Sequence, residues 1–205
     1  LDPSWFGGLA QIINQIALLS IILTGAALIR EREHGTIEHL LVMPVTPSEI
    51  MLAKVWSMGL VVLFAATFAL LFVVKGVLRV PIEGSVALFL VGTSLHLFAT
   101  NSMAIFMATL ARSMPQFGML AVLILMPLQL LSGNATPRES MPQFVQDVML
   151  LAPTTHFVAI GQAILFRGAG LGVVWPQFLA LAVIGAAFFA VSLNRFRKTI
   201  SQMTA

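Results

Sequence analysis

Cysteine is absent from this 205-residue chain, and charged residues are scarce. Without cysteine the chain has no disulfide framework, no thiolate metal site and no cysteine nucleophile. Charged residues make up 9% of the sequence, whereas soluble domains carry about 25%. Hydrophobic residues make up 59%, and the mean hydropathy is +0.98. A soluble core that hid so much apolar surface would need a longer chain, so the composition predicts an integral membrane protein.

Basic residues are too few and too scattered for nucleic-acid binding. The formal net charge of +3 rests on eleven Lys and Arg, which fall near the ends of apolar runs and form no basic stripe with interleaved aromatics. The chain begins at Leu1, and no basic segment precedes its first apolar run as it would in a signal peptide. We therefore expect a fragment or processed chain with further sequence upstream.

The sequence also lacks the motifs of membrane-embedded enzymes. There is no G-x-S-x-G for serine chemistry, no H-E-x-x-H for a metal and no G-x-x-x-x-G-K-[ST] for ATP hydrolysis. The nearest metal-like pattern, His34 with Glu38 and His39, is interrupted by Gly35. We expect no catalytic residue, no metal site and no cofactor bound by this chain. The predicted spans carry no charged residue in their central parts, which disfavours an ion-coupled pump.

Five apolar stretches are long enough to cross a bilayer, which takes about 20 residues. The fourth is short and contains Pro127, so we expect a kinked helix there. The predicted fold is an all-α, polytopic helical membrane bundle. Its expected spans are Leu9–Ile29, Val55–Val74, Ser85–Leu110, Phe117–Ser132 and Leu171–Leu193.

The distribution of Lys and Arg predicts the orientation, because cytoplasmic loops carry an excess of both. With the C-terminus inside, seven of these residues are cytoplasmic: Arg30, Arg32, Lys54, Arg112, Arg195, Arg197 and Lys198. The other four are then outside: Lys75, Arg79, Arg138 and Arg167. The N-terminus of this chain is therefore expected outside, and the segment 30–54 in the cytoplasm.

Local signals in the segment 30–54 predict how it folds. Gly35 favours the end of the first helix, which would run past the membrane to His34. Thr36 can cap a short helix over Ile37–Val42, which Pro44 prevents from continuing. Ile37, Leu40 and Leu41 share one face of that helix, while Glu38 and His39 point elsewhere.

The second half of the segment begins the next helix. Thr46, Pro47 and Glu49 form the pattern of a capping box with proline at the first helical position. That helix can continue unbroken into the second span. A capped, two-faced helix between two spans could dock a cytoplasmic partner or could be a solvated connection, and the residues alone leave both interpretations open.

The segment resembles the coupling-helix region of ABC-2-type permeases, the membrane subunits of a large class of exporters. The matching pattern is E-x-E-x-G-T-x-E-x-L-L, then P-x-x-P-x-E, then a Lys, carried by Glu31, Glu33, Gly35, Thr36, Glu38, Leu40, Leu41, Pro44, Pro47, Glu49 and Lys54. Ala53 stands where family members often have Gly. Later runs are similar too: LSGNATPRESMP (131–142), PTTHF (153–157), FRGAG (166–170) and RFRK (195–198).

The resemblance covers nearly the whole chain and implies one ABC-2-type transmembrane domain over residues 1–205. It is greatest to a bacterial subgroup that has a further N-terminal span and a large periplasmic domain. It implies a bacterial inner membrane, a lipid environment, and a homodimer or a pair with a sister permease. ATP and Mg would bind to a separate cytoplasmic ATPase. The residues implied in coupling to that ATPase are Glu31, Glu33, Gly35, Thr36, Glu38, His39, Leu40, Leu41, Pro44, Pro47 and Glu49.

A polar face on the third span has two interpretations. Thr93, His96 and Thr100, with Asn101 nearby, recur at helical spacing. Such a face in lipid should meet protein or water. It could line a transport pathway, although hydrogen bonding between helices, which holds the bundle together, is the interpretation we favour.

The segment 133–170 is too long for a turn and is broken by three prolines. We expect short amphipathic helices over Phe144–Leu151 and Thr154–Arg167, lying at or dipping into the outer face of the membrane. They would sit at a pathway exit or form a structural cap.

The sequence thus predicts the permease subunit of an ATP-binding-cassette exporter, with no motif that identifies its substrate. One alternative is a membrane anchor or regulator of an ATPase that does not itself transport. An intramembrane enzyme is the other, and the missing motifs disfavour it.

Overall fold

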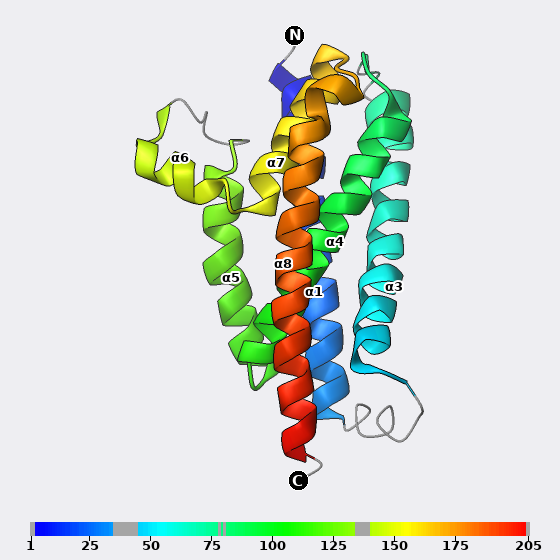
Figure 1. Cartoon of the computed structure of the whole chain (residues 1–205). Coiled ribbons are helices and arrows are strands. Elements are labelled where there is room, and N and C mark those ends of the chain that lie inside the picture. The colour runs from blue at the N-terminus through cyan, green and yellow to red at the C-terminus, as the bar shows by residue number, and fades with distance from the viewer. Residues whose placement is uncertain (1–2, 35–44, 78, 80, 134–139, 204–205) are drawn as a thin grey trace.

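The computed structural model describes residues 3–34, 45–77, 79, 81–133 and 140–203, and within these ranges the secondary structure is helical, with no strand. Figure 1 shows a bundle of long helices with a smaller helical unit at its side. The elements are α1 (Pro3–Glu33), α3 (Pro47–Phe68), η1 (Ala69–Val77), α4 (Val86–Leu110), α5 (Met114–Leu131), α6 (Gln143–Met149), α7 (Pro153–Gly161), η3 (Gln162–Phe166) and α8 (Leu171–Met203).

Five helices of the described part are long and apolar enough to cross a membrane, which confirms the all-α, polytopic fold. The helix α5 continues through Pro127 to Leu131, so the proline does not end it. The candidate spans are Ala10–Glu33, Pro47–Val77, Val86–Leu110, Met114–Leu131 and Leu171–Lys198.

The helix α4 occupies the centre of the bundle and packs against α1, α3, α5, α7 and α8. Its small and hydroxyl-bearing residues allow this close approach, because helices in lipid associate through packing and interhelical hydrogen bonds. On the facing helix α8, Gly185 allows the same close approach. A Cβ atom there would lie 2.6 Å from Cδ1 of Phe98 and 3.2 Å from Cα of Ala99, both on α4. Of the candidate spans α4 is the most buried, with 67% of its apolar window inside the bundle.

The helices α3 and α5 lie at the periphery and expose apolar side chains. On α3, Phe64 and Val61 are largely exposed, and on α5 Met119 and Leu123 are as well. Such faces suit lipid or another membrane-embedded chain. Phe117 joins α5 to α1, because its ring lies where a side chain at Gly25 would otherwise be.

The segment after α5 forms a broken pair of helices. The axes of α6 and of α7 with η3 differ by 91°, so together they form a bent span or a re-entrant loop. The two short helices predicted for this segment are present. Only α6 is largely exposed, however, whereas Phe157, Val158 and Ile160 of α7 are buried among α1, α4 and α8. The helix α7 is thus a part of the bundle core rather than a surface cap.

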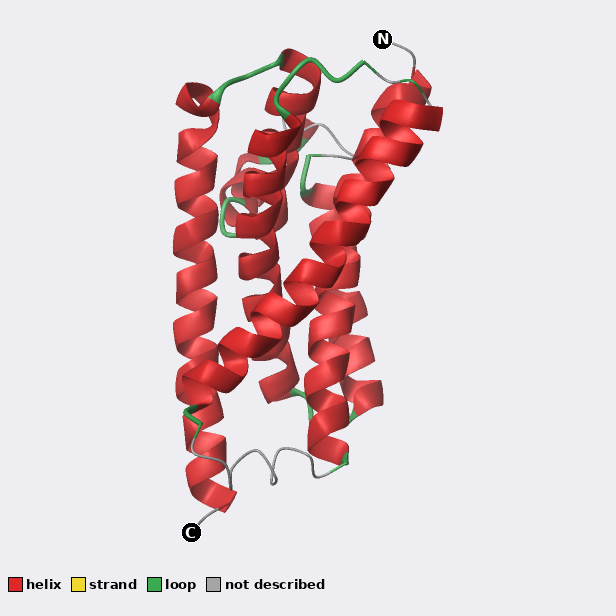
Figure 2. Ribbon diagram, turned by 90° about the vertical axis from the view of Figure 1, so that its right-hand side faces the viewer, coloured by secondary structure: helices red, strands yellow, loops and turns green. Residues whose placement is uncertain are grey.

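One end of the bundle collects the features expected in the cytoplasm, and we call it the loop end. There α1 ends, α3 begins, α4 turns into α5, and α8 carries the C-terminus (Figures 1 and 2). The N-terminal end of α1 and the unit formed by α7 and η3 belong to the opposite half of the molecule. Of the seven basic positions counted for the predicted cytoplasmic side, six lie on α1, α3 or α8, and Arg112 lies in the connection from α4 to α5.

Candidate functional site

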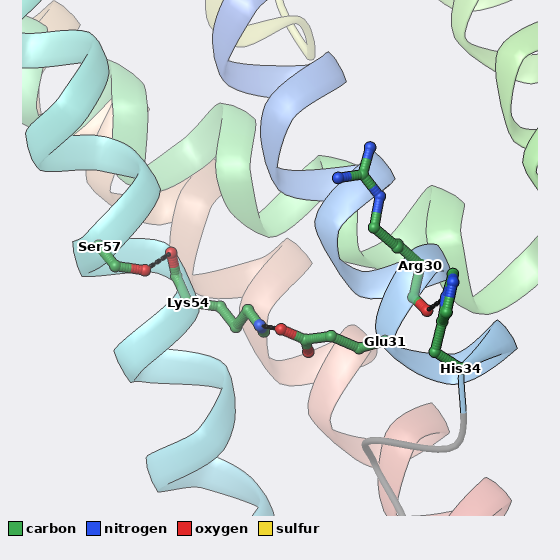
Figure 3. Close-up of polar contacts among 5 residues, drawn as sticks. All are labelled: Arg30, Glu31, His34, Lys54 and Ser57. Carbon is green, nitrogen blue, oxygen red and sulfur yellow. Dashed lines mark hydrogen bonds and ion pairs between the residues drawn. The ribbon is translucent and has the colours of Figure 1, made fainter.

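The predicted coupling residues begin on the last turn of α1. This helix ends at Glu33, and the backbone N–H of His34 donates to the carbonyl oxygen of Arg30 at 3.0 Å. The prediction that the first helix runs past its apolar part to this point is therefore confirmed. The carbonyl of Arg30 also lies 2.8 Å from Nδ1 of His34, so this ring folds back over the helix end (Figure 3).

The middle of the predicted coupling segment lies outside the described residues. This applies to the short helix expected over Ile37–Val42, whose role in coupling stays a prediction. The coupling residues concerned are Gly35, Thr36, Glu38, His39, Leu40, Leu41 and Pro44.

An ion pair joins the two helices that flank this segment in the sequence. Nζ of Lys54 on α3 contacts Oε1 of Glu31 on α1, and the two side chains reach toward each other across the gap between the helices (Figure 3). The side chains of Lys54 and Glu31 are 15% and 26% exposed. A half-buried pair is less screened by water and salt than an exposed one. The two helices that flank residues 35–44 in the sequence are therefore tied together.

The start of α3 is fixed by a capping box. The backbone N–H of Thr46 donates to Oε2 of Glu49 at 2.7 Å, and the hydroxyl oxygen of Thr46 accepts from the backbone N–H of Glu49 at 3.4 Å. Pro47 occupies the first helical position. This confirms the predicted capping pattern, and α3 continues from it without a break as far as Phe68. The segment 35–44 therefore enters a well-defined helix end.

Glu33 does not face the ion pair. Its Oε1 accepts from the backbone N–H of Met114, the first residue of α5, at 2.9 Å. The neighbouring Arg32 donates to the carbonyl oxygens of Ala108 and Ala111 at the end of α4. The predicted coupling residues Glu31 and Glu33 are thus both engaged, but with two different helices.

The polar face of α4 is buried inside the bundle. Thr93, His96, Thr100 and Asn101 are each 0% exposed. The hydroxyl of Thr93 donates to its own helix, at the carbonyl of Phe89 (2.9 Å). These four residues therefore contact protein rather than an open passage in this conformation.

Asn101 joins three helices through its side-chain amide. Its Oδ1 accepts from the hydroxyls of Ser20 and Thr24 of α1, each at 2.8 Å, and its Nδ2 donates to the carbonyl of Val55 on α3 at 3.0 Å. The hydroxyl of Thr100 also contacts Ser20. This polar layer separates the two apolar core clusters of the bundle. It is the interhelical hydrogen bonding that we favoured for this face.

The ring of His96 is packed inside the bundle. Its ring stacks on Phe157 of α7 with the centroids 4.1 Å apart and the planes 7° apart. The backbone of Pro153 interacts with the imidazole, although neither ring nitrogen has a partner within hydrogen-bond geometry in the described part of the chain. The same holds for the buried hydroxyls of Thr154 and Thr155 at the start of α7. Among the described residues, no group of three or more potential metal ligands surrounds it.

One protein-family model matches most of this chain. Residues 8–166 match the family model described as "ABC-2 type transporter". The chain belongs to this family. The match includes the segment 30–54 and the helices that flank it, so the ABC-2 motif and the anchored loop end are the same part of the chain.

The ABC-2 relatives include named permeases. The "Inner membrane transport permease YhhJ" of Escherichia coli strain K12 is 67% identical over 203 residues, which are 99% of this chain and 54% of that protein. The "Probable multidrug ABC transporter permease YbhR" of the same strain is 30% identical over 202 residues, 98% of this chain and 54% of that protein. The "ABC transporter G family member 20" of Dictyostelium discoideum is 26% identical over 186 residues, 88% of this chain and 25% of that protein.

The chain thus spans about half the length of the bacterial ABC-2 relatives. ABC-2 type permeases are membrane subunits of ABC transporters and are not catalytic themselves.

Three contributors to this ABC-2 site were not singled out from the sequence. Ser20 and Thr24 lie four residues apart in the first apolar run, and that spacing, which puts both hydroxyls on one helix face, could have predicted their bonding. The partner of Arg32 could not be predicted, because its acceptors are backbone carbonyls more than seventy residues away.

Proposed function

We propose that this chain is the membrane-spanning permease of an ATP-binding-cassette exporter and that its segment 30–54 docks a separate cytoplasmic ATPase. One observation carries the proposal, namely that the family's motif lies between two anchored helix ends. The ion pair of Glu31 with Lys54 joins the two helices, and the capping box at Thr46 fixes the start of α3. A partner that pulls on residues 35–44 would therefore move α1 and α3 together.

The orientation that we propose puts the loop end in the cytoplasm and the N-terminal end of α1 in the periplasm of a bacterial inner membrane. The support is electrostatic, because seven of the eleven Lys and Arg lie on α1, α3, α8 or the connection from α4 to α5. Transport further requires a second permease, either another copy or a sister chain. The exposed apolar side chains of α5 provide a face that such a subunit could cover.

The coupling roles proposed for Glu38, Leu40 and Leu41 follow from the family motif, and His39 lies between them in the sequence. Glu38 and His39 would make polar contacts with the ATPase, while Leu40 and Leu41 would pack into a groove on it. The buried positions of Thr93, His96, Thr100 and Asn101 favour packing over pathway lining for the polar face of α4.

Site-directed crosslinking tests the docking proposal, and the cysteine-free sequence makes the experiment clean. One variant carries Glu38→Cys and its matched control carries Ser140→Cys, in the segment between α5 and α6 on the other half of the molecule. In inner-membrane vesicles that contain the candidate ATPase, position 38 should capture the ATPase in a manner that changes with ATP. Position 140 should not.

Two outcomes oppose the proposal. Capture from position 140 alone would mean that the orientation is inverted. Capture from neither position, with an ATPase that supports transport by the unmodified protein, would mean that the segment is only a connection. A transport assay in the same vesicles separates an exporter from a membrane anchor, because an anchor would capture the ATPase without moving a substrate.

A further inference from the structure

Three successive charged residues in the last turn of α1, namely Glu31, Arg32 and Glu33, each contact a different helix. Consecutive residues of an α-helix point about 100° apart around the axis, since one turn takes about 3.6 residues. Glu31 therefore faces α3, Arg32 faces the end of α4, and Glu33 faces the start of α5. One turn of α1 thus contacts α3 at Lys54, the end of α4 and the start of α5.

Arg32 caps the C-terminus of α4. Its Nη1 donates to the carbonyl oxygen of Ala108 at 3.2 Å, and its Nη2 donates to that of Ala111. The last carbonyls of a helix lack partners within the helix. They also form the negative end of its dipole, so a guanidinium is the favourable charge there.

Glu33 caps the N-terminus of α5 from a distant part of the sequence. Its carboxylate accepts from the backbone N–H of Met114 at 2.9 Å, at the positive end of that helix dipole. Ser113 occupies the N-cap position, yet its side chain makes no capping hydrogen bond. The carboxylate of Glu33 therefore takes the part that a local cap usually plays. The signs of both charges on α1 match the two helix ends that they meet.

The helix α5 is the least buried of the three helices that Glu31, Arg32 and Glu33 contact. In its apolar window 17% of the residues are buried, as in α8, against 28% for α3 and 67% for α4. The connection from α4 is three residues long, from Ala111 to Ser113. The first turn of α5 is held by the contact of Phe117 with α1, by Oε1 of Gln116, which accepts from the backbone N–H of Arg112 at 2.7 Å, and by the carboxylate of Glu33.

We propose that Arg32 and Glu33 are positioning residues that transmit a displacement of the loop end of α1 to the joint between α4 and α5. The proposal rests on the function proposed above, in which an ATPase moves the segment that directly follows Glu33. The ion pair of Glu31 with Lys54 makes α3 follow α1 in the same way. Of these helices α5 responds most, because it is the least embedded in the bundle.

Distance measurements between two spin labels test the linkage. The labels are attached at Met119→Cys on α5 and at Val191→Cys on α8, both exposed positions in an otherwise cysteine-free chain. The complex with the ATPase is placed in lipid bilayers and diluted with unlabelled protein, so that pairs within one copy dominate. The test variants are R32Q and E33A. The matched control is R30Q, which removes the same charge from an exposed side chain in the same turn.

With the native side chains we expect a narrow distance distribution that shifts when a non-hydrolysable ATP analogue binds. R32Q and E33A should broaden the distribution without nucleotide and should lose most of the shift, while R30Q behaves like the parent. E33Q should keep most of the shift, because the glutamine carbonyl can still accept from the N–H of Met114. If R32Q and E33A match R30Q in both width and shift, the linkage is wrong.

Failure of the linkage can be told apart from failure of the proposed function. Crosslinking from position 38 reports whether the ATPase docks, and it does not depend on α5. If the ATPase does not dock, the proposed function fails, while the width of the nucleotide-free distribution still tests whether Arg32 and Glu33 hold α5. If the ATPase docks and the width is unchanged in the variants, the linkage alone is overturned.

Discussion

Glu31 of α1 and Lys54 of α3 form an ion pair that spans 23 positions of sequence and joins the two helices that flank the predicted coupling segment. Oε2 of Glu31 is buried and has no hydrogen-bond partner within the described residues. The pair is therefore only partly compensated by its surroundings. Loss of either partner leaves a half-buried charge alone.

This arrangement predicts that single substitutions at the pair cost more than the double substitution. We expect Glu31→Gln and Lys54→Met each to lower the free energy of unfolding by about 1–3 kcal/mol, between the values for exposed and buried pairs. The double variant should lose less than the sum of the two single losses, because it leaves no lone charge. Unfolding in detergent, followed by tryptophan fluorescence, measures all three.

The control for this cycle is Arg197→Gln, which removes an exposed cation from the same end of the bundle. It should leave stability nearly unchanged. Additive losses in the double variant would show that the two charges do not interact and that the pair does not tie α1 to α3.

The sequence predicted the features that depend on neighbouring residues. The apolar runs placed the long helices, and Thr46 with Glu49 placed the start of α3, because a capping box involves residues only three positions apart. Features that depend on distant residues were out of reach. The capping of α5 by Glu33 joins positions 81 residues apart, and no local pattern distinguishes that carboxylate from a solvated one.

The position of α7 illustrates the same limit. Its sequence has the mixture of apolar and hydroxyl-bearing residues that suits either a membrane surface or a bundle interior. In the structure, Phe157 stacks on His96, and the helix enters the core. A helix face that meets polar groups of other helices and one that meets headgroups can have the same composition, so only tertiary packing decides between them.

Asn101 provides a test of the polar layer. Asn101→Ala removes the acceptor for Ser20 and Thr24 and the donor to the carbonyl of Val55, so three interhelical hydrogen bonds are lost. Such bonds in membrane proteins contribute on average about 0.6 kcal/mol each. We therefore expect a loss of roughly 1–3 kcal/mol, which resistance to unfolding by SDS can measure.

The matched control is Ser94→Ala on the same helix, since the hydroxyl of Ser94 donates only to the carbonyl of Leu90 in its own helix. Its stability should be close to that of the parent. If Asn101→Ala were as stable as Ser94→Ala while transport were lost, the face would serve the pathway rather than the packing of the bundle.

The loop before α4 approaches the end of η3 very closely at Gly84. A Cβ atom at position 84 would lie 2.1 Å from the carbonyl oxygen of Ile164 and 2.9 Å from its carbonyl carbon. The backbone N–H of the adjacent Glu83 donates to the carbonyl of Leu165 at 3.2 Å, which holds the two segments together. The clash involves backbone atoms, so a rotamer change cannot relieve it. Gly84→Ala should therefore separate the segments at a cost of about 1–3 kcal/mol.

Gly172→Ala is the appropriate comparison for Gly84→Ala. It makes the same chemical change in the first turn of α8, where a Cβ atom would meet nothing within 4 Å. Alanine is also the better helix former by about 1 kcal/mol, so this variant should be neutral or slightly more stable. Thermal unfolding of both variants, with hydrogen exchange at Glu83, measures the difference. Equal stability of the two, with slow exchange at Glu83 in both, would mean that residues 83–84 do not contact η3 in solution.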